Sequence, residues 1–239
     1  MTISLDTGRY TVGLATSAAD LQAAQKLRYA VFAEEMGALL DSPVSGLDAD
    51  RFDAFCDHLL VRDGSEVVGT YRLLPPGRKE RLPADAEFDL TALAPLRKGL
   101  VEAGRTCVHP GHRNGTVVAL MWAGIARYMV SGGHQWLAGC CAVPLDDRGA
   151  LAAAVAERVP LGPEEYRVTP RAPWRPKKPA AAPDRFVPPA LMRGYLRLGS
   201  WVCGAPAHDG DSGTADFFML LSMANVNARY LRHFLGSSL

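Results

Sequence analysis

The stretch Leu100–Val130 constrains the fold of this chain more than any other part of the sequence. It opens with an apolar run that contains several β-branched residues, and such a run favours a buried strand. Pro110 ends the run, because proline lacks the N–H group that a strand needs for its hydrogen-bond ladder. After a short polar loop, apolar residues recur at helical spacing over Val117–Met129. The sequence therefore predicts a buried strand, a polar loop and a helix in direct succession.

The polar loop within this stretch has the composition of an anion-binding site. It contains Arg113 and Gly115 and leads into the start of the predicted helix. Backbone N–H groups and the positive end of the helix dipole meet at such a point, and both favour an anion. A phosphate-bearing ligand is the functional interpretation. An ordinary strand–loop–helix connection is the alternative, because one arginine and one glycine form a common pattern.

Glu102 and Arg105 are charged residues within the predicted buried strand. Charged side chains are rarely buried unless they are paired or functional. Strict alternation along a strand would point the two to opposite faces, but Gly104 between them allows a β-bulge. A bulge would bring both charges to one face and leave a backbone N–H free to bind a carbonyl oxygen. A structural ion pair between them is the alternative.

Length and composition narrow the class of protein. A chain of 239 residues with a hydrophobic fraction of 48% suits a single domain, 1–239, with a sizeable core. The net charge of +1 gives no field that would attract nucleic acid. The first residues lack the pattern of a signal peptide, and no apolar stretch reaches membrane-spanning length. The five cysteines form no regular framework, which predicts reduced thiols in a cytoplasmic protein.

Alternation, helical periodicity and turn residues predict an α/β fold, with a mixed central β-sheet flanked by helices. The predicted strands are Tyr10–Ala15, His58–Arg62, Glu66–Leu74, residues 100–108, Gln135–Val143, Trp201–Ala205 and Ala215–Leu221. The predicted helices run from Ser17 to about Met36, over residues 116–130, and over Asp146–Arg158, Leu191–Leu198 and Met223–Phe234. The strands before and after the central helix should be parallel neighbours joined by a right-handed crossover.

Further charges are concentrated in one strand and two irregular regions. Arg72 lies in the apolar strand Glu66–Leu74, where a functional arginine and a snorkelling edge arginine are the two interpretations. Residues 40–57 form an acidic loop, which is either solvated or a flap that presents carboxylates to an amine. Residues at about 159–189 form a proline-rich basic connector. This connector is predicted to dock an acidic partner protein or an anionic membrane surface.

Several motifs resemble, in order, the landmarks of a known superfamily. They are LRYAVF (Leu27–Phe32), Asp53 and Asp57, GTYRLLP (Gly69–Pro75) and EAGRTCVHP (Glu102–Pro110). The same landmarks occur in acyl-homoserine-lactone synthases, N-acyl amino acid synthases and bacterial ornithine-acyl carrier protein N-acyltransferases, all within the Gcn5-related N-acetyltransferase (GNAT) superfamily. WAGIARYM (Trp122–Met129), LAGC (Leu137–Cys140) and the tail from Gly194 resemble the ornithine enzymes of lyso-ornithine lipid synthesis most closely.

The resemblance implies a GNAT-like fold and an amide-forming acyltransferase without a bound cofactor. The implied donor is a (3-hydroxy)fatty acyl group on the phosphopantetheine of acyl carrier protein, with acyl-coenzyme A as the alternative. The implied acceptor is the amine of ornithine or a similar amino acid. The implied catalytic residues are Glu102 as general base, with Arg105 and Arg72 arranging the site. The donor would be bound by Val108, Arg113, Asn114, Gly115 and Thr116, and the acceptor by Arg28, Phe32, Asp53 and Asp57.

Four other interpretations compete with ornithine acylation. The first is an acyl-homoserine-lactone-type or other N-acyl amino acid or peptide synthase. The second is a non-catalytic module that binds acyl chains. The third is nucleophilic chemistry by Cys107 with His109 or His112, which would need a thiolate beside a base. The fourth is a metal site; no metal is expected, because Cys107, His109, His112 and Cys140 match no recognised ligand spacing.

Overall fold

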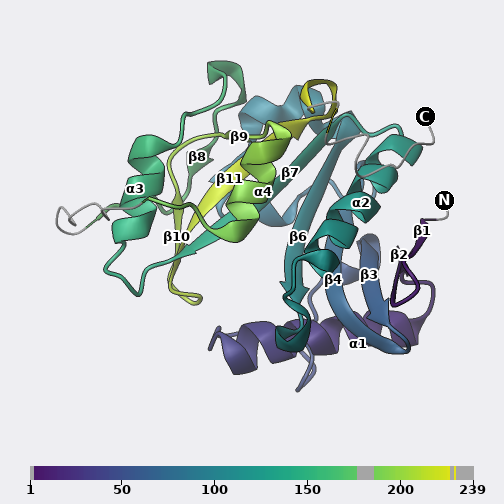
Figure 1. The fold of residues 1–239 in the computed structure, drawn as a ribbon. Helices are drawn as coiled ribbons and strands as arrows, with labels where there is room; N and C mark the ends of the chain where they lie inside the picture. Colours follow the sequence, from purple (N-terminus) through teal and green to yellow (C-terminus); the bar gives the residue numbers. More distant parts are fainter. Residues whose placement is uncertain (1–2, 177–185, 227–228, 230–239) are drawn as a thin grey trace. The chain divides into compact units, whose positions relative to one another are not determined.

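The computed structural model describes residues 3–176, 186–226 and 229 of the chain, and the figures draw the remaining residues in grey (Figure 1). The chain forms two compact units. Unit 1 comprises Met1–Lys79, Val101–Gln135 and Ala228–Leu239, and unit 2 comprises Glu80–Leu100 and Trp136–Asn227. Because each unit is built from separate segments, neither corresponds to one continuous stretch of sequence. The expectation of one domain over residues 1–239 stays a prediction.

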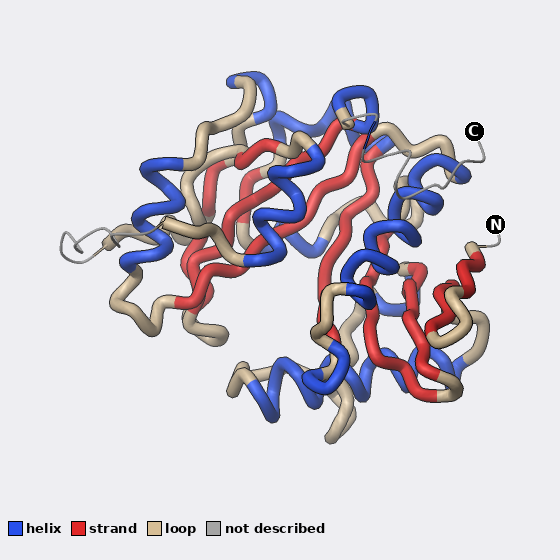
Figure 2. Tube along the Cα trace, in the orientation of Figure 1, coloured by secondary structure: helices blue, strands red, loops and turns tan. Residues whose placement is uncertain are grey.

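Unit 1 is built on an antiparallel sheet in the order β1-β2-β3-β4-β6 (Figures 1 and 2). Its strands are β1 Ser4–Asp6, β2 Tyr10–Leu14, β3 Asp57–Asp63, β4 Glu66–Leu74 and β6 Leu100–Val108, the last of which starts in unit 2. Its helices are α1 Ala18–Tyr29, the π-helix η1 Ala30–Glu35, the short 3₁₀ turns η2 Asp53–Phe55 and η5 Pro110–His112, and α2 Thr116–Ser131. The strand–loop–helix unit around residue 110 thus has the form predicted from the sequence.

Helices α1 and α2 cover opposite faces of this sheet. Leu60 and Cys107 pack against Ala24 and Leu27 of α1. The neighbouring residue Leu59 faces α2, where a Cβ added at Gly124 would lie 2.8 Å from a Leu59 methyl carbon. Successive residues of a strand point to opposite faces, so this alternation along β3 separates an α1 face from an α2 face. Polar side chains on the α1 face form the site described below.

Helix α1 begins at a capping box and ends in a π-helix. Ser17 accepts a hydrogen bond from the N–H of Asp20, whose carboxylate caps the first turn in return. The sequence predicted one helix to about Met36, but the turns widen to π-helical hydrogen bonding over Ala30–Glu35. Such π-helical turns are rare and often lie at functional sites. Here the π-helix carries Phe32 and Glu35, both of which contact residues of the predicted site.

The predicted β-bulge lies in β6, and the residue in the unusual backbone conformation is Arg105. Thr70 of β4 pairs with Cys107 and Arg72 pairs with Gly104, so two residues of β6 lie opposite Tyr71 alone. Arg105 has a φ of 50°, in the left-handed region, whereas Gly104 does not. The sequence suggested that Gly104 permits the bulge. The strain is instead carried by a residue with a Cβ, at a cost of about 1–2 kcal/mol.

Gly104→Ala is therefore expected to leave the fold intact and to raise the free energy of unfolding by about 0.4–1 kcal/mol. An added Cβ at Gly104 meets no atom within 4 Å, and the unfolded chain loses freedom when glycine is replaced. Gly69→Ala in β4 is the matched control, because its Cβ would lie 2.7 Å from Cγ1 of Val117. Urea denaturation measures both variants. A destabilisation of Gly104→Ala by more than about 1 kcal/mol would show that the bulge depends on this glycine.

Unit 2 is built around strands β7 Trp136–Pro144 and β11 Thr214–Ser222, which pair antiparallel over their full length. Strands β9 Trp201–Val202 and β10 Ala207–Asp209 pair with β11, and β5 Phe88–Asp89 pairs with β8 Thr169–Pro170. Helices α3 Ala150–Arg158 and α4 Ala190–Leu198 pack on β7 and β11 respectively. The 3₁₀ turns are η3 Pro83–Ala86, η4 Thr91–Gly99, η6 Glu164–Tyr166 and η7 Met223–Asn225.

The structure adds detail to two sequence predictions in unit 2. The first part of the proline-rich connector is folded: Thr169–Pro170 forms a strand, and the N–H of Arg171 donates to the carbonyl of Glu87 at 2.8 Å. Lys177, Lys178 and Arg185 of the connector lie outside the described residues. The predicted closing helix Met223–Phe234 starts as a 3₁₀ turn, and most of its remaining residues are not described. The parallel pairing expected across the central helix would join the two units and stays a prediction.

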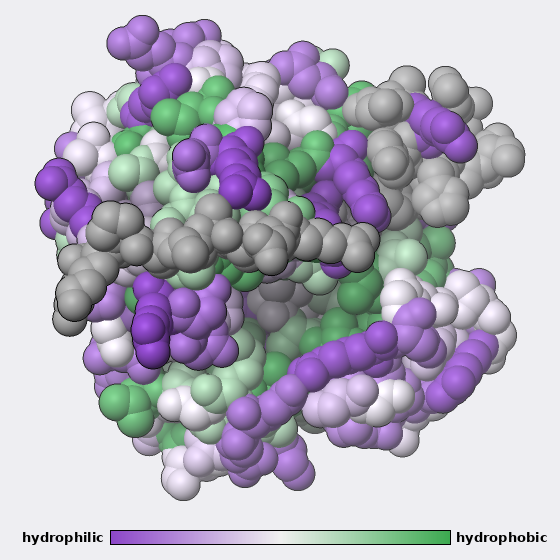
Figure 3. All heavy atoms as spheres, turned by 60° about the vertical axis from the view of Figure 1, so that its left-hand side comes forward, coloured by the Kyte–Doolittle hydropathy of each residue, from purple (hydrophilic) through white to green (hydrophobic). Residues whose placement is uncertain are grey.

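Within the described ranges, no helix combines the length and the apolar character that a membrane span requires. On the face drawn in Figure 3, hydrophilic residues predominate, and hydrophobic residues are visible between them. Such a mixture is usual for folded proteins, whose surfaces still expose many apolar atoms.

Candidate active site

Three arginines and three aspartates form a largely buried ion-pair network on the α1 face of unit 1. The arginines are Arg28 of α1, Arg72 of β4 and Arg105 of β6, and the aspartates are Asp48, Asp50 and Asp53 of the acidic loop. Asp48, Asp50 and Asp53 of this loop are therefore not free in solvent, because each is held by at least one guanidinium. The guanidiniums come from one helix and two strands that lie far apart in the sequence.

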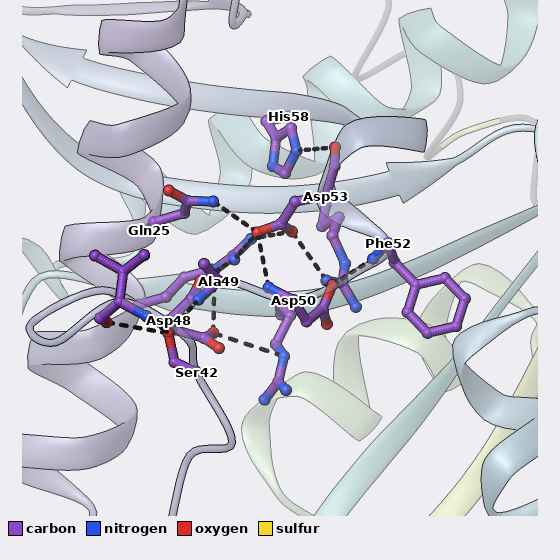
Figure 4. A network of polar contacts seen from close by, with 12 residues as sticks. Gln25, Ser42, Asp48, Ala49, Asp50, Phe52, Asp53 and His58 are labelled. Carbon is purple, nitrogen blue, oxygen red and sulfur yellow. Dashed lines mark hydrogen bonds and ion pairs between the residues drawn. The ribbon is translucent and has the colours of Figure 1, made fainter.

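Asp53 is the centre of this network (Figure 4). Its carboxylate accepts hydrogen bonds from Nη2 of Arg28 at 2.7 Å, Nη1 of Arg72 at 3.0 Å and Nε2 of Gln25 at 2.8 Å. Burial raises the pKa of a carboxyl, but the hydrogen bond and charge of Arg28 outweigh it and hold the pKa of Asp53 well below its usual range. Asp53 is therefore ionised at neutral pH and fixes the positions of two arginines.

Arg72 and Arg28 are buried and paired with aspartates inside the protein. Nη1 of Arg72 donates to Asp50 at 2.7 Å as well as to Asp53, and the charge of Asp50 raises the pKa of Arg72 despite the opposing effect of burial. Arg28 is 0% exposed, pairs with Asp48 at 3.1 Å, and donates to the Asp48 carbonyl. Of the predicted acceptor-binding residues, Arg28 and Asp53 thus lie within the network rather than on its surface.

Gln25 and His58 complete the network, and sequence reasoning identified neither. The Nε2 atom of His58 lies 3.1 Å from the carbonyl oxygen of Asp53, and burial lowers the pKa of His58, which keeps the ring neutral at physiological pH. Gln25 lies one turn before Arg28 on α1 and is buried. The sequence signal for Gln25 was its place on the face of α1 that also carries Ala24 and Arg28. Glutamine is seldom buried without a polar partner, so this position indicates a polar site.

Glu102 and Arg105 lie on the same side of the sheet as Arg72. Glu102 pairs in register with Leu74, and Gly104 with Arg72, so Glu102 faces the α1 side. Nε of Arg105 lies 3.6 Å from Asp48, which Arg28 also contacts. Glu102 is 6% exposed, and its charge, with those of Arg72, Asp53 and Asp50, acts on the buried thiol of Cys56. The bulge therefore has the predicted effect of bringing both charged residues to one side.

The aspartates and arginines of this network balance in number. Asp48, Asp50 and Asp53 pair with the three guanidiniums, and His58 adds no charge. Glu102 is a further buried carboxylate on the same side of the sheet. Phe32 lies beside this cluster, with its ring centroid 5.9 Å from Cζ of Arg105.

Asp57 lies apart from the other predicted acceptor-binding residues. Its carboxylate accepts a hydrogen bond from the Tyr128 hydroxyl of α2 at 2.7 Å and pairs with Arg78 at 2.8 Å. Asp57 precedes His58 on β3 and so points to the α2 face, away from Asp53. The structure thus separates two aspartates that the resemblance had grouped together.

The predicted donor loop joins β6 to α2. Arg113 donates to both carboxylate oxygens of Glu35 at 2.6 and 2.7 Å, and its Nε donates to the carbonyl of Val108. Gly115 has a φ of 85°, which glycine adopts without strain, and precedes the first residue of α2. Asn114 caps the N–H of Thr116 with its side-chain oxygen at 3.1 Å. The N–H groups of Val117 and Val118 belong to the open first turn of the helix.

Nucleophilic chemistry by Cys107 does not fit this site. Burial raises the pKa of the Cys107 thiol to about 12, so the thiolate needed for attack is not formed at neutral pH. Cys107 packs instead against Leu27 and Val31 as a small apolar residue. The described residues also contain no group of histidine, cysteine and acidic side chains arranged to hold a metal ion.

Comparison with known proteins places the chain in a family. Residues 27–123 match the acetyltransferase (GNAT) domain. The chain is 35% identical to an L-ornithine N(alpha)-acyltransferase of Brucella abortus (strain 2308), over 95% of the chain and 89% of the relative. It is 36% identical to the enzyme of that name from Rhizobium meliloti (strain 1021), over 92% of the chain and 82% of the relative.

Solved structures agree with this assignment at the level of the fold. The AHL synthase LasI superposes with a TM-score of 0.57 at 15% identity, covering 96% of this chain and 95% of LasI. FeeM, an N-acyl amino acid synthase from uncultured soil microbes, superposes with a TM-score of 0.56 at 15% identity, covering 90% of this chain and 92% of FeeM. These matches confirm the α/β, GNAT-like fold that the motifs predicted. The chain belongs to the L-ornithine Nα-acyltransferase family of GNAT acyltransferases, and its donor is an acyl thioester.

Proposed function

We propose that this enzyme transfers a (3-hydroxy)fatty acyl group from acyl carrier protein to the α-amine of ornithine. The acceptor is inferred from relatives whose names specify L-ornithine and which align over more than nine tenths of this chain. The observation in the structure that supports an amine acceptor is the buried carboxylate of Glu102, which lies on the same side of β6 as the arginine–aspartate network. A carboxylate at this position can take a proton from an ammonium group.

In the proposed reaction, Glu102 takes a proton from the ammonium group, directly or through one water. The neutral nitrogen attacks the thioester carbonyl carbon, the new C–N bond forms, and the C–S bond breaks. The sulfur leaves as the thiol of the carrier after it takes up the proton that the amine releases. A backbone N–H at the β6 bulge can stabilise the oxyanion of the tetrahedral intermediate. Arg28, Arg72 and Asp53 act as positioning residues that hold the acidic loop against Glu102.

The donor loop suits a thioester that carries a single phosphate. Arg113 and the open N–H groups at the start of α2 would bind that phosphate, with Asn114, Gly115 and Thr116 shaping the turn and Val108 holding the Arg113 side chain. Phosphopantetheine on a carrier protein has one phosphate, whereas coenzyme A has three. Acyl carrier protein is therefore the proposed donor, and use of acyl-coenzyme A is the alternative outcome.

The Arg113–Glu35 pair gives a test of donor binding. Glu35 occupies both outer nitrogens of Arg113, so a donor phosphate must compete with it. Glu35→Gln is expected to lower the Michaelis constant for acyl carrier protein, and Arg113→Gln to raise it, by about 10-fold. Arg9→Gln, which removes an exposed arginine paired with Asp63, is the control. If both loop variants keep the wild-type constant, Arg113 does not bind the donor.

The basic connector is the surface that we assign to the acidic carrier protein. Arg167 and Arg171 of this segment use their Nε atoms on the carbonyls of Gly162 and Asp85, which leaves the outer nitrogens near the surface. An anionic membrane surface would meet the same charges, and the amphiphilic product suits a peripheral enzyme on the cytoplasmic side. Salt weakens both attractions. Co-sedimentation with anionic vesicles, with and without carrier protein, distinguishes the two partners.

The proposed function is tested by mass spectrometry of lipids from bacteria that express the protein. The expected result is a new amide-linked acylornithine that resists mild alkali, because amides survive conditions that cleave esters. If a different acylated amino acid appears in place of acylornithine, the protein is an N-acyl amino acid synthase that uses another acceptor. Tight acyl-donor binding without any new amide would favour the non-catalytic module.

A further inference from the structure

We propose that Arg105 binds the carboxylate of the acceptor and thereby restricts the enzyme to free α-amino acids. This inference rests on the proposed function, since it assigns how the acceptor of that reaction is recognised. Glu102 and Arg105 lie on one side of β6, three residues apart across the bulge. An α-amino acid carries its ammonium and its carboxylate on the same carbon, so one residue of each charge can receive both groups.

The three arginines of the network differ in how far they are open to a ligand. The side chains of Arg28 and Arg72 are 0% and 6% exposed, and both donate to Asp53. The Arg105 side chain is 37% exposed, and its contact with Asp48 involves Nε alone at 3.6 Å. None of the hydrogen bonds among the described side chains uses the two outer nitrogens of Arg105. A carboxylate binds such a pair of parallel N–H donors with two hydrogen bonds.

The backbone and a neighbouring ring hold this guanidinium in place. Arg105 adopts a left-handed conformation, which a side chain with a Cβ rarely does, although glycine lies immediately before it. Strained residues that persist in this way are concentrated at functional sites. The ring of Phe32 lies 5.9 Å from Cζ of Arg105, at the outer limit of a cation–π contact. Phe32 itself packs against the cluster of Ala24, Leu27 and Val31, so its position is fixed.

The ligand of Arg105 is better explained as an acceptor carboxylate than as the donor phosphate. The proposed phosphate loop begins after Val108, and three strand residues span about 10 Å. Between its phosphate and its thioester, the pantetheine arm carries no charge. At the position of Arg105 the donor therefore presents no anion, whereas an amino acid acceptor does. Simple amines lack this second charge and would leave the Arg105 donors unsatisfied.

The test compares ornithine with ornithine amide, which keeps both amines but has no carboxylate. Wild-type enzyme is expected to use ornithine with a kcat/KM about 10- to 100-fold above that for the amide. Arg105→Gln should lower kcat/KM for ornithine mainly through KM and reduce the preference for ornithine over the amide to within about 2-fold. Arg105→Lys keeps the charge without the paired donors, so its kcat/KM for ornithine should lie between the values of wild type and Arg105→Gln.

Each outcome of this experiment supports or overturns the inference. A wild-type enzyme that uses the amide as well as ornithine overturns it, and this result does not depend on any variant folding. An Arg105→Gln enzyme that keeps the wild-type thermal midpoint but loses both acceptors equally also overturns it, because Arg105 then acts on the reaction itself. Arg9→Gln is the matched control for loss of an arginine from unit 1. If wild-type enzyme acylates neither acceptor, the proposed function fails, and that result differs from loss of discrimination alone.

Discussion

Replacement of Glu102 by glutamine is expected to lower turnover by about 10²–10⁴-fold, which is the usual contribution of a general base. Glutamine keeps the size and polarity of the side chain but cannot take the proton from the ammonium group. Glu102 is buried on the side of β6 that carries the arginine–aspartate network, so the fold should tolerate the isosteric change. Binding of the acyl donor should change little, so the loss should appear in kcat at saturating donor.

The pH dependence separates this role from a structural one. The defect of Glu102→Gln should shrink as the pH rises, because more of the amine is already neutral and needs no base. Glu66→Gln replaces an exposed glutamate of β4 and should behave as wild type. A Glu102→Gln enzyme with normal turnover at neutral pH would remove Glu102 from the mechanism. A variant that loses its thermal transition would indicate that Glu102 serves a structural ion pair.

Asp53→Asn is expected to produce the largest loss of stability, about 3–5 kcal/mol in the free energy of unfolding. The substitution removes the charge that Arg28 and Arg72 share and leaves two buried guanidiniums with less compensation. An isolated buried charge costs far more than an intact pair gains. Asp63→Asn is the control, since its pair with Arg9 is largely exposed and should contribute at most about 1 kcal/mol. Urea denaturation at neutral pH measures both.

The stabilising role of Asp53 can also be tested by measuring the free energy of unfolding as the pH is lowered. Because the pKa of Asp53 is lower in the folded protein than in the unfolded chain, its stabilisation is complete above the unfolded value of about 4. The stabilisation is lost as the pH falls from that value toward the folded pKa. Wild-type enzyme should therefore lose stability in acid more steeply than Asp53→Asn. If the free energy of unfolding falls with pH equally steeply in wild type and in Asp53→Asn between neutral pH and about pH 3, Asp53 is not held ionised by the arginines.

Local patterns in the sequence predicted the elements of the fold well. The predicted strand at residues 100–108 coincides with β6, and the predicted helix at 116–130 with α2, because proline and glycine mark their boundaries. The π-helical hydrogen bonding of Ala30–Glu35 was not predicted, since apolar spacing continues unchanged to Met36. The short strand β1 was also missed; three residues carry too little alternation to identify.

The sequence identified several charged residues of the site but not the ion pairs between them. Glu102, Arg105 and Arg72 were identified as charges within apolar strands, and the structure brings them to one side of a sheet. The pairing of Arg105 with Asp48 and of Arg72 with Asp50 depends on contacts between distant segments, which no local pattern specifies. The resemblance likewise grouped Asp57 with Asp53, whereas alternation along β3 turns Asp57 toward Tyr128.

The most direct test of the account uses purified enzyme, acyl carrier protein charged with a 3-hydroxyacyl group, and L-ornithine. The products are separated by liquid chromatography, and fragmentation in a tandem mass spectrometer identifies which nitrogen carries the acyl group. The predicted result is Nα-acylornithine, formed with one equivalent of free carrier thiol and nearly abolished in Glu102→Gln. Acylation of the δ-amine, or release of the thiol without an amide product, would contradict the account.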